Sequence, residues 1–123
     1  MWLAGGARKV QRLGLAVLPL LFTPLGCHSR YVNATVANHT GSTISPLEID
    51  YPSASFGTES LADGATFKYR LKLLGSGGTK AIWTDARHQE HSATGPTLHE
   101  GQEGTLHVEL TPAGATWAPS LTP

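Results

Sequence analysis

The sequence is almost without cysteine: Cys27 is the only one in 123 residues. A single thiol cannot form an intrachain disulfide, so the disulfide scaffold common in small secreted domains is excluded. Long apolar runs are also missing, because the longest, residues 13–22, has ten residues, whereas a membrane-spanning helix needs about 20. No amphipathic helical period follows Cys27. The part of the chain after Cys27 must therefore build its core from strands.

An excess of basic charge is missing as well. The whole chain carries nine basic and nine acidic residues, but Arg8, Lys9 and Arg12 precede Cys27. The remainder therefore keeps six basic and nine acidic residues, a net charge of −3. A small, mildly acidic domain has no electrostatic reason to bind nucleic acid, so we expect no nucleic-acid partner.

The first 26 residues have the three parts of an export signal. Arg8, Lys9 and Arg12 form a positive region, and residues 13–22 form an apolar segment of signal-peptide length. The following Thr-Pro-Leu-Gly-Cys at 23–27 resembles the bacterial lipobox, in which a small residue precedes an obligatory cysteine; Gly26 fits, whereas Pro24 stands where leucine is usual. The resemblance implies a lipoprotein signal peptide over 1–26, which is removed, and a lipidated Cys27 that begins a short linker over 27–30.

Lipidation at Cys27 would hold the protein on membrane lipid through several acyl chains. Because Cys27 has no cysteine to pair with, the lone thiol favours this interpretation. His28 is not the aspartate associated with retention in the inner membrane, so we expect the periplasmic side of a bacterial envelope, with the outer membrane favoured over the inner. Two alternatives remain: an ordinary signal peptide with a leftover thiol, and a signal anchor in which Cys27 is incidental.

After Cys27, short runs of alternating apolar residues recur about every ten residues between turn signals. This spacing predicts an all-β fold, an antiparallel β-sandwich of six or seven strands over residues 31–118 with a flexible tail over 119–123. The expected strands lie at 31–37, 43–51, 67–73, 79–85, around His91, at 105–111 and at 116–117. The alternation places on the inward faces, among others, Val32, Val36, Tyr69, Leu106, Val108 and Leu110. We expect Gly75–Gly78 to join the third and fourth of these as a hairpin. Residues 52–64 are predicted to be irregular, with Phe56 and Leu61 folded back onto the core, and residues 86–94 to be mostly loop.

This arrangement of strands after such a leader resembles small immunoglobulin-like β-sandwich domains of bacterial envelope lipoproteins. The resemblance concerns architecture, and it implies no activity. The cysteine pair of antibody domains is absent, since the only cysteine precedes the first strand.

No catalytic constellation is visible. Acidic residues are scattered over loops and strand ends, and no Gly-x-Ser-x-Gly sequence surrounds a serine. We therefore expect no enzymatic activity and no cofactor. The alternative is a periplasmic copper or zinc protein that uses His88, His91, His99 and His107, because imidazole is the commonest metal ligand. In the other interpretation these histidines belong to solvated loops and strand faces.

A stripe of Lys68, Arg70 and Lys72 along the clearest strand is a candidate interaction surface, together with Phe56 in the neighbouring loop. Lys68, Arg70 and Lys72 could face anionic headgroups or simply form a solvated strand face. Two Asn-x-Thr sequons, at Asn33 and Asn38, read as strand and turn residues rather than glycan acceptors in a bacterial context. The leading hypothesis is a non-enzymatic envelope module that contacts another envelope protein through a strand edge or through residues 52–64.

Overall fold

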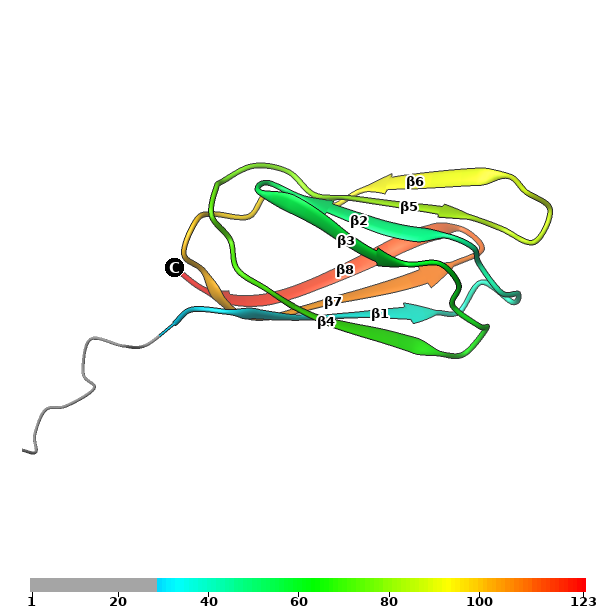
Figure 1. Ribbon diagram of the computed structural model, residues 1–123, viewed down its shortest axis with the longest axis horizontal. Helices are drawn as coiled ribbons and strands as arrows, with labels where there is room; N and C mark the ends of the chain where they lie inside the picture. The colour runs from blue at the N-terminus through cyan, green and yellow to red at the C-terminus, as the bar shows by residue number, and fades with distance from the viewer. Residues whose placement is uncertain (1–28) are drawn as a thin grey trace, which may run out of the picture.

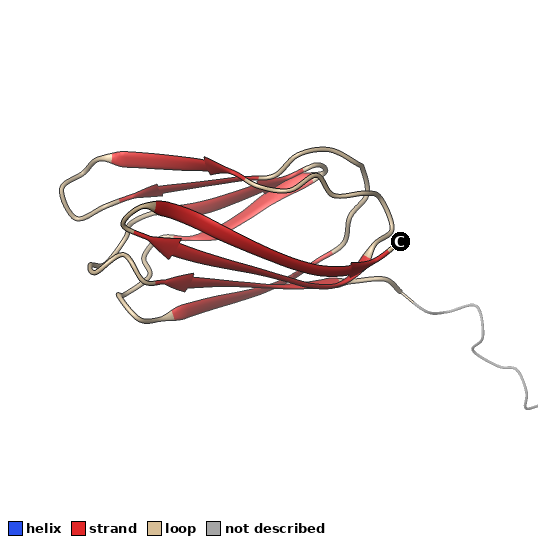
Figure 2. Ribbon diagram, turned by 180° about the vertical axis from the view of Figure 1, so that it is seen from behind, coloured by secondary structure: helices blue, strands red, loops and turns tan. Residues whose placement is uncertain are grey.

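The computed structural model describes residues 29–123. The expected signal peptide and Cys27 lie outside the described residues. Within 29–123 all regular secondary structure is β, as Figure 2 shows, and no helix there is long and apolar enough to cross a membrane.

Eight strands form two four-stranded sheets that pack face to face (Figure 1). The strands are β1 (Val32–Asn38), β2 (Leu47–Tyr51), β3 (Ala54–Thr58), β4 (Thr66–Leu71), β5 (Lys80–Thr84), β6 (Glu90–Thr94), β7 (Glu103–Thr111) and β8 (Gly114–Thr122). One sheet has the order β4-β1-β7-β8 and the other β3-β2-β5-β6. The predicted all-β sandwich is confirmed, with eight strands instead of six or seven. The expectation that it is antiparallel throughout is wrong for one pair, because β1 pairs with β7 in parallel.

The alternating residues of β1 and β7 build the centre of the core. Val32 and Val36 of β1 and Val108 of β7 are fully buried, and β1 pairs with β7 in parallel, with Val36 opposite Val108. From the other sheet, Ile49 of β2 and Trp83 of β5 close the core. Because successive side chains of a strand point to opposite faces of the sheet, every second residue of these strands points into the core, as expected.

The predicted hairpin through Gly75–Gly78 is wrong. β4 pairs with β1, and β5 pairs with β2 and β6, so the segment between β4 and β5 crosses from one sheet to the other. Its path is fixed by buried Leu73 and by a bridge between Gly77 and Leu98. Glycine-rich composition indicates a turn, but it does not specify whether the strands on either side belong to one sheet or to two.

Two segments predicted to be irregular are strands, and the weak strand predicted around His91 is confirmed. β3 lies within residues 52–64, β6 covers Glu90–Thr94, and β8 continues to Thr122 through the predicted tail. All three are edge strands of their sheets. Their outer faces meet solvent, and their sequences are correspondingly polar. The predicted burial of Phe56 and Leu61 is confirmed.

Candidate functional site

The two sheets of the described region have four edge strands, and three of them carry features that discourage pairing with another chain. β4 carries Lys68 and Arg70, β6 carries Glu90, and β8 contains Pro119. Charged side chains and prolines are the usual means by which sheet edges avoid further strands. β3, with the sequence Ala-Ser-Phe-Gly-Thr, has neither. It is the edge best suited to accept an extended segment.

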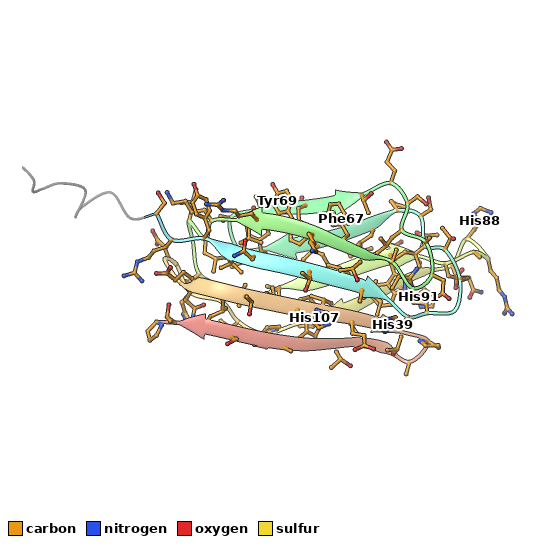
Figure 3. The ribbon with its side chains drawn as sticks, turned by 90° about the horizontal axis from the view of Figure 1, so that it is seen from below. His39, Phe67, Tyr69, His88, His91 and His107 are labelled. Atoms are coloured by element: carbon orange, nitrogen blue, oxygen red, sulfur yellow. The ribbon has the colours of Figure 1, made fainter. Side chains whose placement is uncertain are left out.

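An aromatic cluster of four rings joins β3 to β4 across the side of the sandwich. Phe56 of β3 stacks on Tyr69 of β4 with ring centroids 4.5 Å apart and an angle of 9° between the planes. Phe67 and Tyr51 lie 6.2 Å and 6.1 Å from the same Phe56 ring. Figure 3 shows Phe67 and Tyr69 projecting from β4 at this side. Burial, and to a lesser extent Tyr69, raises the pKa of the Tyr51 hydroxyl.

Tyr69, and not the predicted interaction residue Phe56, is the exposed ring of this cluster. Phe56, a candidate contact residue, is only 6% exposed, whereas Tyr69, expected to point inward, is 41% exposed. Tyr69 does lie on the inward side of β4, but β4 is an edge strand, so its inward side is only partly covered. Tyr69 is therefore the ring of the cluster that faces solvent, and the Phe56 ring stacks on its buried side.

A hollow of about 370 Å³ lies beside the aromatic cluster, over β2 and β3. Leu47, Ser55 and Gly57 are among the residues that line it. A Cβ atom on Gly57 would collide with the backbone carbonyl oxygen of Leu47, so only glycine fits at this point of β3. The hollow is large enough for a side chain of a bound segment.

The basic stripe is exposed, as predicted. Lys68 and Arg70 point away from the core on the outer face of their sheet, opposite Thr35 and Asn33 of β1. The Arg70 guanidinium lies 3.9 Å from the centre of the Tyr31 ring, and the Lys72 ammonium 5.9 Å from it. Such cation–aromatic contacts orient the two side chains while keeping their charge available to solvent.

Acidic residues collect on the opposite face of the molecule. Glu48 and Asp50 lie on β2, in the other sheet, and so do not neutralise the basic stripe. Asp50 raises the pKa of the Glu48 carboxyl, first through a hydrogen bond between the two side chains and then through charge repulsion. Glu90 raises it further, and Lys80 opposes the effect. The sandwich thus has one basic edge and one acidic face.

The four histidines of the metal hypothesis are not brought together. His88 lies in the β5–β6 turn and His91 on β6, whereas His107 lies on the outer face of the other sheet (Figure 3). His99 lies between β6 and β7, at the other end of the sandwich. Within residues 29–123 no three His, Cys, Asp or Glu side chains are placed to hold a metal ion. His107 instead hydrogen-bonds to the Thr35 hydroxyl at 2.7 Å.

His91 belongs to an arrangement that the sequence did not predict. Its Nε2 lies 2.8 Å from Asp85 Oδ2, and its ring stacks on Trp83 with centroids 5.5 Å apart. The other Asp85 carboxylate oxygen accepts hydrogen bonds from the N–H groups of Arg87 and Gln89. The hydrogen bond from His91, followed by that from the Gln89 N–H, lowers the pKa of Asp85 to about 2.

This pair lines a hollow of about 400 Å³ at the end of the sandwich where β1 ends. Thr40, which also lines it, donates its hydroxyl hydrogen to Asn38 and so is held by that side chain. The Asp85 carboxylate closes the β5–β6 turn by binding two of its N–H groups, and His91 keeps that carboxylate in place. The arrangement accounts for the geometry of the β5–β6 turn.

No protein-family model and no curated protein matches the chain. Among solved structures, the chain is similar to the NMR structure of a protein from Eubacterium rectale, with a TM-score of 0.50 and 11% sequence identity. The similarity covers 79% of this chain and 93% of the other. At this identity the likeness bears on the fold alone.

Proposed function

We propose that this protein is a non-enzymatic, lipid-anchored module of a bacterial envelope that binds an extended segment of another envelope protein along β3. The observation that carries the proposal is the composition of β3, the one edge of the described sheets without charge or proline. The lone Cys27, directly after a leader of signal-peptide character, supports the anchor.

In this binding mode the partner adds a strand to the sheet β3-β2-β5-β6. Backbone hydrogen bonds to the free edge supply affinity, and pockets for alternate side chains supply specificity. The hollow over Gly57 would take one partner side chain, and the exposed ring of Tyr69 would pack against another. Because Phe56 stacks beneath Tyr69, the aromatic contact is preformed and loses little freedom on binding.

Site-specific crosslinking in intact envelopes tests the edge. A photoreactive residue replaces Ser55 on β3 in one strain and Ser92 on β6 in another; both serines are exposed residues of edge strands in the same sheet. We expect a discrete adduct from position 55, mapped by mass spectrometry to an extended peptide of one partner, and none from position 92. In addition, S55K should reduce the adduct formed by a photoreactive residue at Thr58, whereas S92K should not. Equal adducts from both positions would refute β3 as the binding edge.

Mass spectrometry of the membrane fraction tests the anchor independently. We expect a mature chain that begins at Cys27 and carries the mass of its acyl chains. A chain that begins elsewhere, or begins at Cys27 without acyl mass, would contradict lipid anchoring and leave the binding edge unaffected.

A further inference from the structure

The end of the sandwich where β1 begins, here called the N-terminal pole, combines basic and apolar side chains. β1 and β4 are antiparallel, with Val32 opposite Leu71, so Lys72 comes to lie beside Tyr31 and Leu74 just beyond it. Figure 1 shows that the start of β1, the end of β4 and the C-terminus all lie at this pole. The N-terminal pole is thus the part of the domain nearest to Cys27 in covalent distance.

Leu74 stands out at the N-terminal pole because it is 67% exposed. The only other large apolar side chain that is exposed in the described residues is Tyr69, at 41%. The N–H of Leu74 donates a hydrogen bond of 3.2 Å to the Ser53 hydroxyl, and its neighbour Leu73 is buried in the core. The backbone at Leu74 is therefore held in place while its side chain is exposed to solvent.

The basic residues at the N-terminal pole differ in whether an acidic side chain lies close to them. The Arg30 guanidinium lies 3.9 Å from the Glu103 carboxylate, and it donates hydrogen bonds of 3.4 Å to the Gly101 carbonyl oxygen and to a backbone oxygen of Pro123. Glu100 is also at this pole and lines a hollow with Lys72 and Leu74. Arg70 and Lys72 pack on the Tyr31 ring, and neither forms an ion pair with an acidic side chain of residues 29–123.

We propose that the N-terminal pole rests on the membrane surface, with Leu74 inserted among the lipid headgroups and with Arg70 and Lys72 against the phosphates of anionic phospholipid. This inference rests on the proposed lipid anchor. Cys27 precedes Arg30 by three residues, a span of at most about 11 Å even when fully extended, so an anchored chain holds this pole at the headgroups. An amphipathic surface with an aromatic ring, an aliphatic side chain and basic groups is the composition that such an interface favours.

The contact would set the orientation of the whole domain. All eight strands run between the N-terminal pole and the opposite end (Figure 1), so the sandwich would stand on the membrane instead of lying along it. β3 would then extend away from the lipid along its full length. Its edge would remain accessible to a partner while the anchor is engaged.

Depth-dependent quenching tests the contact. The mature chain from Cys27, which contains the whole sandwich and a single thiol, is coupled to a maleimide phospholipid in vesicles of phosphatidylcholine and phosphatidylglycerol with brominated acyl chains. We expect L74W to lose clearly more tryptophan fluorescence than the parent chain, whose Trp83 and Trp117 give the background. The matched variant A113W, in the β7–β8 turn at the opposite end, should show no such excess. Equal excess quenching in both variants, or none in either, would overturn the proposal.

A comparison of two charge-removing substitutions, K72Q and K68Q, tests the electrostatic part of the contact. In the L74W chain, K72Q should reduce the excess quenching, and it should do so only when phosphatidylglycerol is present. One basic residue near an anionic surface contributes about a fivefold factor to binding. K68Q makes the same change about 13 Å farther from the pole and should leave the quenching unchanged. Equal effects of K72Q and K68Q would remove the role of Lys72.

The parent chain offers the same test without substitution. Hydrogen exchange of the amides of residues 72–76 should slow on vesicles relative to the free chain, and that of residues 113 and 114 should not. Slowing at 113 and 114 instead, or at neither segment, would overturn the orientation. Because maleimide chemistry supplies the anchor, these results do not depend on acylation in cells or on a protein partner. Failure here is therefore distinguishable from failure of the proposed function.

Discussion

Replacing Asn38 with alanine is expected to destabilise the domain more than any other single polar substitution on β1. The Asn38 side chain is fully buried at the end of that strand. Its amide nitrogen donates to the carbonyl oxygens of Ser42 and Leu61, each at 2.9 Å, and its amide oxygen accepts from the N–H and the hydroxyl of Thr40. One side chain thereby connects β1, the turn after it and the segment before β4.

The magnitude follows from these four hydrogen bonds. Each contributes about 1 kcal/mol net, and a buried group that loses its partner costs about 1–3 kcal/mol. The Leu61 carbonyl oxygen keeps the N–H of Ile44 as a donor, and the Thr40 hydroxyl, which already lies 3.0 Å from the Ser42 carbonyl oxygen, can turn to it. The loss in N38A is therefore close to that of the hydrogen bonds themselves. We therefore expect N38A to lower the free energy of unfolding by about 3–4 kcal/mol, a large part of the roughly 5–15 kcal/mol typical of a domain.

Urea unfolding of the mature chain, followed by the fluorescence of buried Trp83, measures the effect. The matched control is N33A, the same change on the same strand at an exposed position, which should cost no more than about 0.5 kcal/mol. In a thermal melt the N38A difference corresponds to roughly 12–30 °C. If the free energies of unfolding of N38A and N33A differ by less than about 1 kcal/mol, the hydrogen bonds of the Asn38 side chain do not stabilise the fold as argued.

Three further predictions concern other parts of the sandwich. The pKa of Asp85 is about 2 in the folded chain, below its ordinary value of 3.8. The Asp85 carboxylate therefore stabilises the fold above about pH 4, and this stability is lost as the pH falls toward 2. Urea unfolding midpoints measured across this range should depend less on pH in D85N than in the parent chain. G57A should destabilise the domain by about 2 kcal/mol or more and abolish crosslinking from β3, because the added methyl group meets the carbonyl oxygen of Leu47; wild-type stability and crosslinking in this variant would refute the reasoning. The buried indole N–H of Trp117 has no hydrogen-bond partner within the described chain, so W117F should leave the melting temperature unchanged or raise it, and a loss above about 1 kcal/mol would contradict this.

Much of the core could be predicted from sequence because a strand that is central in its sheet has one buried and one solvated face. Val32 and Val36 of β1, and Leu106, Val108 and Leu110 of β7, alternate with polar residues and are buried as predicted. Alternation fails at edges, where both faces meet solvent in part. β3, β6 and the C-terminal half of β8 therefore lack the pattern, and Tyr69 on edge strand β4 is exposed despite it.

The candidate site was predictable only in part for the same reason. Lys68 and Arg70 are exposed as expected, and Phe56 lies beside their strand. The distinction between β3 and the other edges depends on which strands are neighbours in each sheet, and residue composition does not encode that order. Nothing local indicates the Asp85–His91 pair either, because it depends on how the β5–β6 turn closes.

By itself, the sequence determined the all-β class, the inward residues of the central strands, and a lone Cys27 that divides a basic N-terminal segment from an acidic remainder. These properties are local: they follow from the two-residue period of a strand and from counts of charge and thiols. Only the tertiary structure decided that the Asn38 side chain is buried at the end of β1 and that β4 and β5 lie in different sheets. It also decided that Leu74 and Lys72 lie at the end of the sandwich where β1 begins. Each of these depends on contacts between residues distant in sequence, which form when the two sheets close over a common core.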